Sequence, residues 1–88
     1  WMQLPKLKVL AEAGAVREME VSYATGTEGW TGAITYATRT GERREVLERQ
    51  RGGVRRFATL DAAARALAGL GLTAFRVDAA GLTGEESP

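Results

Sequence analysis

Residues 30–57, WTGAITYATRTGERREVLERQRGGVRRF, decide the fold, because two turn signals separate segments in which inward and outward positions alternate. In the first segment the inward positions are Trp30, Gly32, Ile34 and Tyr36, and small or polar residues stand between them. This period of two predicts a strand with one buried face.

The first turn signal is Thr40-Gly41, which suits a two-residue hairpin. A turn there predicts three cross-strand pairs: Arg39 with Glu42, Tyr36 with Glu45, and Ile34 with Leu47. Because facing residues share one side of a sheet, this register places Leu47 on the core side, which favours it.

The second turn signal is the glycine pair Gly52-Gly53. A two-residue loop would place Glu48 opposite Phe57. A three-residue loop, residues 51–53, instead places Leu47 opposite Phe57 and Glu48 opposite Arg56. The longer loop pairs apolar with apolar and charge with counter-charge, so we expect it.

The segments before this hairpin predict a helix followed by a strand. LPKLKVLAEAGA (residues 4–15) has Pro5 near its start and Gly14 near its end, as short helices do. In VREMEVSYA (residues 16–24) the apolar positions Met19, Val21 and Tyr23 alternate with polar ones, as in a half-buried strand.

The segments after the hairpin predict a second helix and a last strand. Thr59 is a good N-cap for the alanine-rich helix TLDAAARALAGLG (residues 59–71), and a strand follows over residues 72–79. The order α-β-β-β-β-α-β predicts an α+β fold: a two-layer sandwich with a mostly antiparallel sheet and both helices on one face. We expect one domain over residues 1–80 and a flexible C-terminal tail over residues 81–88.

The composition excludes much chemistry. The 88 residues include no cysteine and no histidine, which removes disulfides, thiol chemistry, the usual zinc ligands and histidine acid–base catalysis. We therefore expect a cytoplasmic protein that is not an enzyme, with no cofactor, metal, small-molecule substrate or membrane contact. The pair Tyr36 and Glu45 could suggest acid–base chemistry, but a tyrosine hydroxyl satisfied at a sheet margin is the simpler interpretation.

The net charge of +1 hides an uneven distribution. Residues 39–57 carry a net charge of +4 and the remainder of the chain carries −3. An uneven charge distribution affects what a protein binds more than how it folds. We therefore take the seven arginines of this segment as candidate contacts to a partner protein or to nucleic acid. They are Arg39, Arg43, Arg44, Arg49, Arg51, Arg55 and Arg56.

The predicted registers place Arg44 and Arg56 on the side of the sheet that the helices leave open. Three interpretations of that side stay open: a solvated face, a platform for another protein or a second copy (a homodimer), and a surface for the DNA backbone. Three interleaved glutamates, and the lack of an aromatic series for base stacking, weigh against nucleic acid.

The stretch RRFATLDAAARALAGLGLTAFRVDAAG, residues 55–81, resembles the ParC-like family of plasmid partition-associated proteins. The similarity lies in an aromatic residue, a Leu-Asp pair, an alanine-rich helix, Leu-Gly, a phenylalanine and Val-Asp. Here these are Phe57, Leu60-Asp61, Leu70-Gly71, Phe75 and Val77-Asp78. The resemblance implies a bacterial, cytoplasmic accessory protein of plasmid or mobile-element partition or maintenance, and it transfers no catalytic or binding residue.

Overall fold

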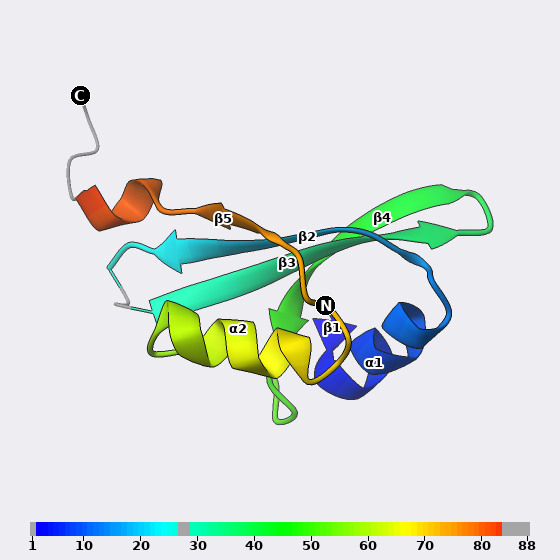
Figure 1. Ribbon diagram of the computed structural model, residues 1–88, viewed down its shortest axis with the longest axis horizontal. Coiled ribbons are helices and arrows are strands. Elements are labelled where there is room, and N and C mark those ends of the chain that lie inside the picture. Colours follow the sequence, from blue (N-terminus) through cyan, green and yellow to red (C-terminus); the bar gives the residue numbers. More distant parts are fainter. Residues whose placement is uncertain (1, 27–28, 84–88) are drawn as a thin grey trace.

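The computed structural model describes residues 2–26 and 29–83 (Figure 1). Two α-helices, one 3₁₀ helix and a five-stranded sheet make up this part of the chain. In chain order the elements are β1 (Met2–Gln3), α1 (Leu4–Glu12), β2 (Val16–Ala24), β3 (Gly29–Thr38), β4 (Gly41–Glu48), α2 (Leu60–Ala68), β5 (Arg76–Asp78) and η1 (Ala80–Thr83).

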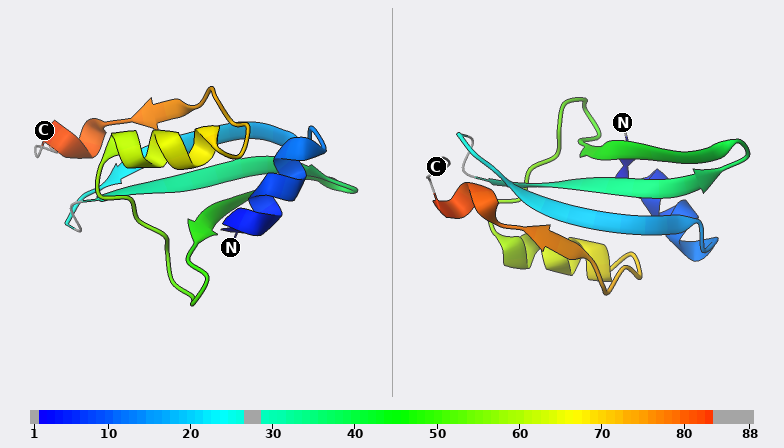
Figure 2. Two further views of the ribbon diagram at one scale, coloured as in Figure 1. Left: turned by 60° about the horizontal axis from the view of Figure 1, so that its bottom comes forward. Right: turned by 90° about the horizontal axis from the view of Figure 1, so that it is seen from above.

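The sheet has the order β1-β4-β3-β2-β5 (Figure 2). Its three long central strands are antiparallel, whereas the short edge strands β1 and β5 run parallel to β4 and β2. The fold is therefore α+β as predicted, but the sheet is mixed, and the expectation of a mostly antiparallel sheet is wrong. A parallel pair of strands needs a long crossover connection, and here each such connection contains a helix.

The first hairpin turns one residue earlier than predicted. Thr38 pairs with Gly41 and Ile34 pairs with Glu45, so Arg39 and Thr40 form the turn. The Thr38 side chain stabilises this turn, since its hydroxyl donates to the Gly41 carbonyl and accepts from the Thr40 N–H. The predicted partners are thus wrong by two residues, but a two-residue shift keeps every side chain on its predicted face.

The second turn also differs from the prediction. Glu48 bridges Val54 across a loop of residues 49–53, and Phe57 bridges Trp30 at the start of β3, so neither predicted pair forms. Arg49 closes the loop through its N–H, which donates to the Gly53 carbonyl, and its Nε, which donates to the Gly52 carbonyl. Phe57 and Trp30 exchange two main-chain hydrogen bonds of 2.8 Å. Isolated bridges therefore replace the predicted fourth strand.

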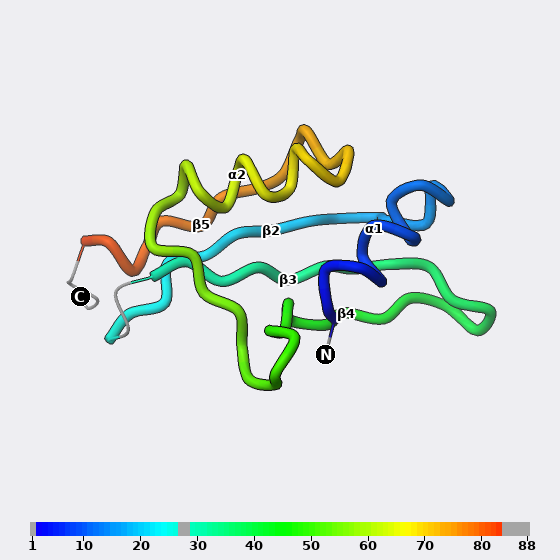
Figure 3. Tube along the Cα trace, turned by 90° about the horizontal axis from the view of Figure 1, so that it is seen from below, coloured from blue at the N-terminus to red at the C-terminus, as the bar shows by residue number. Residues whose placement is uncertain are grey.

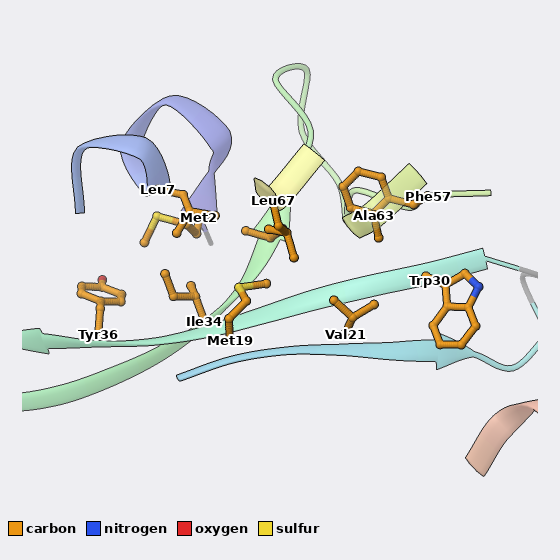
Figure 4. Close-up of a cluster of buried hydrophobic side chains, with 11 residues drawn as sticks. Met2, Leu7, Met19, Val21, Trp30, Ile34, Tyr36, Phe57, Ala63 and Leu67 are labelled. Atoms are coloured by element: carbon orange, nitrogen blue, oxygen red, sulfur yellow. The ribbon is translucent and has the colours of Figure 1, made fainter. Parts of the chain in front are cut away.

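Helices α1 and α2 lie against the same side of the sheet (Figure 3). Leu7 from α1, and Ala63 and Leu67 from α2, are fully buried above strand residues such as Met19 and Ile34 (Figure 4). The hydroxyl of Thr59 accepts from the Ala62 N–H at 3.0 Å, which confirms the predicted N-cap. The eleven buried hydrophobic side chains form one core on this side of the sheet.

The two ends of the described chain hold features that the sequence pattern did not indicate. Met2 is fully buried and belongs to β1, a strand absent from the prediction. The last strand is limited to residues 76–78, and part of the expected tail, residues 81–83, lies in η1. Residues 84–88 lie outside the described part. No helix in the described part is long and apolar enough to cross a membrane.

Candidate interaction surface

The side of the sheet opposite the helices carries no covering element within residues 2–26 and 29–83 (Figure 2). We call this side the open face. Its centre is made of small side chains, and charged side chains flank it on the neighbouring strands. The open face comprises Glu18, Glu20 and Ser22 of β2, Thr31, Ala33, Thr35 and Ala37 of β3, Glu42, Arg44 and Val46 of β4, and Arg76 and Asp78 of β5.

Arg44 is fixed across the middle of the open face. Its Nη2 lies 2.7 Å from Oε1 of Glu20, two strands away, and its Nη1 donates to the hydroxyl of Thr35 at 3.4 Å. Thr35 pairs with Arg44 on one side and with Glu18 on the other, whereas Glu20 pairs with Ala33, so Arg44 reaches diagonally across β3 to Glu20. The guanidinium therefore spans the central strand and is already paired with a carboxylate.

Two further arginines are paired with carboxylates on or beside the open face. Nη1 of Arg76 on β5 lies 2.7 Å from Oε2 of Glu18, and this hydrogen bond raises the pKa of Arg76. Nε of Arg17 lies 3.8 Å from Oε2 of Glu42. Sequence reasoning did not select Arg17 or Arg76. Arg17 lies at the register shift in β2, and Arg76 reaches Glu18 through the parallel pairing of β5, neither of which periodicity reveals.

The seven predicted arginines are distributed over five places. Arg39 lies in the hairpin turn, and Arg43 lies on the helix side, where its Nη2 is 3.6 Å from Glu45 Oε2. Arg44 lies on the open face. Arg56 projects from the side opposite buried Phe57, and a Cβ on Gly29 would lie 3.5 Å from the Cβ of Arg56. The remaining three, Arg49, Arg51 and Arg55, line a hollow of about 430 Å³ together with Gln50.

Arg55 has the most confined position of the seven. Its guanidinium carbon lies 5.0 Å from the centroid of the Phe57 ring, within the range of a cation–π contact. Its Nε is buried and has no hydrogen-bond partner within residues 2–26 and 29–83. Stacking on Phe57 therefore orients the guanidinium, which also lines a second, smaller hollow beside the start of α1.

Tyr36 and Glu45 form a close pair on the helix side of the sheet. The tyrosine hydroxyl donates to Oε2 of Glu45 at 2.6 Å. This hydrogen bond raises the pKa of Tyr36 and lowers the pKa of Glu45. Both shifts favour a protonated tyrosine and an ionised glutamate, which is the reverse of what a tyrosine base would need. The pair supports the interpretation of a satisfied hydroxyl.

Acidic side chains do not gather into a metal site in the part of the chain that the structure describes. Asp78 accepts a hydrogen bond from the Ala80 N–H at 3.0 Å, and so helps to join β5 to η1.

Comparison with known proteins adds one match. A family model described as ParC-like matches residues 3–84, which is nearly the whole chain. No curated protein and no solved structure matches significantly.

Proposed function

The chain belongs to the ParC-like family, and on this premise we propose that it is a non-enzymatic accessory protein of plasmid partition or maintenance that binds a protein partner through the open face. The family supports the plasmid-related role. The binding mode rests on the observation that the uncovered open face holds its central arginine paired with a carboxylate.

Electrostatics on the open face favour a protein over nucleic acid. A DNA backbone gains affinity from cations that are free to replace counterions at its phosphates. Arg44 and Arg76 each lie 2.7 Å from a glutamate, so a phosphate would have to compete with that glutamate. Charges of both signs at fixed positions instead suit a protein surface of complementary charge.

The shape of the open face indicates the kind of protein surface that it would accept. Small side chains such as Ala33 and Thr35 occupy its centre, so a flat partner could approach the strands closely. The paired charges are carried by residues of the flanking strands, as at the polar rim of a protein interface, and the Arg44–Glu20 pair also crosses the central strand. We infer a partner within the partition machinery that presents a flat centre of small or apolar residues bordered by charges.

A bulky charge at the centre of the open face tests this function. Ala33→Arg should weaken binding to the purified protein components of the plasmid's partition system by about tenfold or more, measured by biolayer interferometry. The matched control is Val9→Arg, which adds the same side chain at a position that is 63% exposed on α1. Equal binding by both variants, or no binding by the wild type, would contradict the proposal, provided that circular dichroism shows an intact fold.

A second candidate function is contact with the DNA backbone, and it is favoured by the loop arginines. Arg49, Arg51 and Arg55 line one hollow, and no ion pair involves them within the described ranges 2–26 and 29–83. Anisotropy of a labelled duplex at about 50 and 200 mM salt tests this function, because phosphate contacts weaken as salt rises. Arg51→Glu should abolish binding, whereas Val9→Arg should not. Absence of wild-type binding at low salt would exclude this candidate.

A further inference from the structure

The outer edge of β4 is mostly unpaired within the described residues. Strand β1 covers only Leu47 and Glu48, through its pairs with Met2 and Gln3. The rest of β4, from Gly41 to Val46, has β3 on one side and no strand on the other (Figure 3). An uncovered edge presents main-chain donors and acceptors that another strand can pair with.

The hairpin determines which main-chain groups point outward. Thr38 and Gly41 close a two-residue turn, and the closing pair of such a hairpin exchanges hydrogen bonds across the strands. Because the bonding direction alternates along a strand, Gly41, Arg43 and Glu45 bond toward β3. The N–H and C=O groups of Glu42 and Arg44 therefore point to the free edge.

We propose that β4 pairs antiparallel with β4 of a second copy of this chain, with Glu42 of each copy opposite Arg44 of the other. Each such pair exchanges two main-chain hydrogen bonds, so the two-fold arrangement forms about four of them. The two five-stranded sheets then join into one continuous sheet.

Charge selects this register over its neighbours. Antiparallel pairing through the outward groups allows three central arrangements: Glu42 opposite Glu42, Glu42 opposite Arg44, or Arg44 opposite Arg44. The first register places Glu42 opposite Glu42 and forms no opposite-charge pair within the strand. The third places Arg44 opposite Arg44, and its two opposite-charge pairs use Glu45, whose carboxylate already accepts from Tyr36. The second places Glu42 opposite Arg44 twice, at the cost of one like pair, Arg43 with Arg43. Strand β4 contains no lysine or proline, and its charges are of both signs, so a second copy can meet them with opposite charges.

The same register places Arg43 opposite its counterpart at the two-fold axis, on the helix side of the sheet. Each Arg43 has its own carboxylate nearby, since its Nη2 lies 3.6 Å from Glu45 Oε2. This pairing reduces the repulsion between the two guanidinium groups. On the open face, Glu42 and Arg44 of the two copies would join the existing pairs with Arg17 and Glu20 into one row of alternating charges.

This inference is independent of the proposed partner, because it concerns only the purified chain. A dimer of this kind would place two open faces side by side and so double the surface available to a partner. Failure of the dimer would leave the proposed protein-binding face untouched, and loss of partner binding would leave the dimer untouched.

Sedimentation equilibrium on the full chain, with charge-swapped variants, tests the proposal. The wild type should show a concentration-dependent dimer, and Glu42→Arg should raise the dimer dissociation constant by about tenfold or more. The double variant Glu42→Arg/Arg44→Glu restores opposite charges across the interface, so it should recover dimerisation. Lys8→Glu on α1, an exposed charge reversal away from the edge, should leave the dimer unchanged.

Hydrogen exchange gives a second readout that does not depend on a variant folding correctly. The amides of Glu42 and Arg44 should become more protected as protein concentration rises, because only the dimer pairs them. A wild type that stays monomeric up to millimolar concentration would overturn the proposal. A dimer that forms equally well in Glu42→Arg, with no added protection at residues 42 and 44, would overturn it too.

Discussion

The hydrogen bond between Tyr36 and Glu45 makes the stability of the protein depend on pH. The pKa of Glu45 is lowered from 4.5 in the folded state, so its contribution is present above pH 4.5 and is lost as the pH falls further. The pKa of Tyr36 is raised from 10.0, so its contribution is present below pH 10 and is lost as the pH rises through the folded-state value.

We therefore expect Tyr36→Phe to lower the free energy of unfolding most between about pH 5 and 9, where the pair is intact. The difference from the wild type should shrink as the pH falls below 4.5 and the carboxylate takes up a proton. Urea unfolding followed by circular dichroism across this range measures it. Glu45→Gln should give a similar profile, and a Tyr36→Phe effect that does not vary with pH would show that packing alone is lost.

Gly32 is constrained by packing rather than by its backbone conformation. A Cβ at this position would lie 2.8 Å from Cδ1 of Leu47 and 2.9 Å from Cε of Met19. Both neighbours are buried core side chains, so Gly32→Ala should lower the free energy of unfolding by about 1–3 kcal/mol. Urea denaturation tests this, and Leu47→Val in the same chain should recover part of the loss. Full stability in Gly32→Ala alone would contradict the expected overpacking.

At the scale of single elements, the N-terminus of α2 depends on one side chain. The hydroxyl of Thr59 satisfies the N–H of Ala62 at 3.0 Å. Thr59→Ala leaves that N–H without its partner and should cost about 1 kcal/mol of unfolding free energy, whereas Thr59→Ser keeps the hydroxyl and should cost less. The shift in urea midpoint between the two variants measures the cap itself. Equal midpoints would mean that solvent replaces the hydroxyl at no cost.

The elements that the sequence predicted well are those with local signals. The N-cap Thr59 and the alanine run predict α2, and the alternation of apolar and polar residues predicts β2 and β3. Each of these signals depends only on neighbours along the chain. The sequence did not predict the exact turn of the first hairpin. Thr40-Gly41 is a good turn pair, but the two hydrogen bonds of the Thr38 hydroxyl favour a turn at Arg39-Thr40. The inward and outward faces were predicted correctly because an error of two residues preserves them.

At the scale of the whole molecule, pairing between residues far apart in the sequence determines contacts that local sequence patterns do not predict. We expect Phe57 opposite Leu47 from the sequence, but it bridges Trp30, because the segment after β4 touches Glu48 only at Val54 and then pairs with the start of β3. Arg44 was selected from the sequence, but its partner Glu20 is 24 residues away and became visible only with the three-strand register. The arginine-rich segment therefore indicated candidate contact residues, but it did not indicate that the fold would distribute them over separate parts of the surface.

Strand β1 shows how residues at the start of the described chain stabilise the whole fold. Met2 is fully buried and pairs with Leu47, so β1 covers the last two residues of β4 while Met2 fills the core beneath the helices. Met2→Ala would leave a cavity there and should lower the free energy of unfolding by about 2–5 kcal/mol, whereas Met2→Leu should cost less than about 1.5 kcal/mol.

Chemical denaturation of the three proteins measures this contribution, with Val9→Ala as the matched control. Val9 is 63% exposed on α1, so its truncation should change the free energy of unfolding by less than about 0.5 kcal/mol. If Met2→Ala were as stable as Val9→Ala, β1 would not be part of the stable core, and the edge of β4 would be free over its whole length. A large loss confined to Met2→Ala would instead show that β1 limits the free edge to the segment before Leu47.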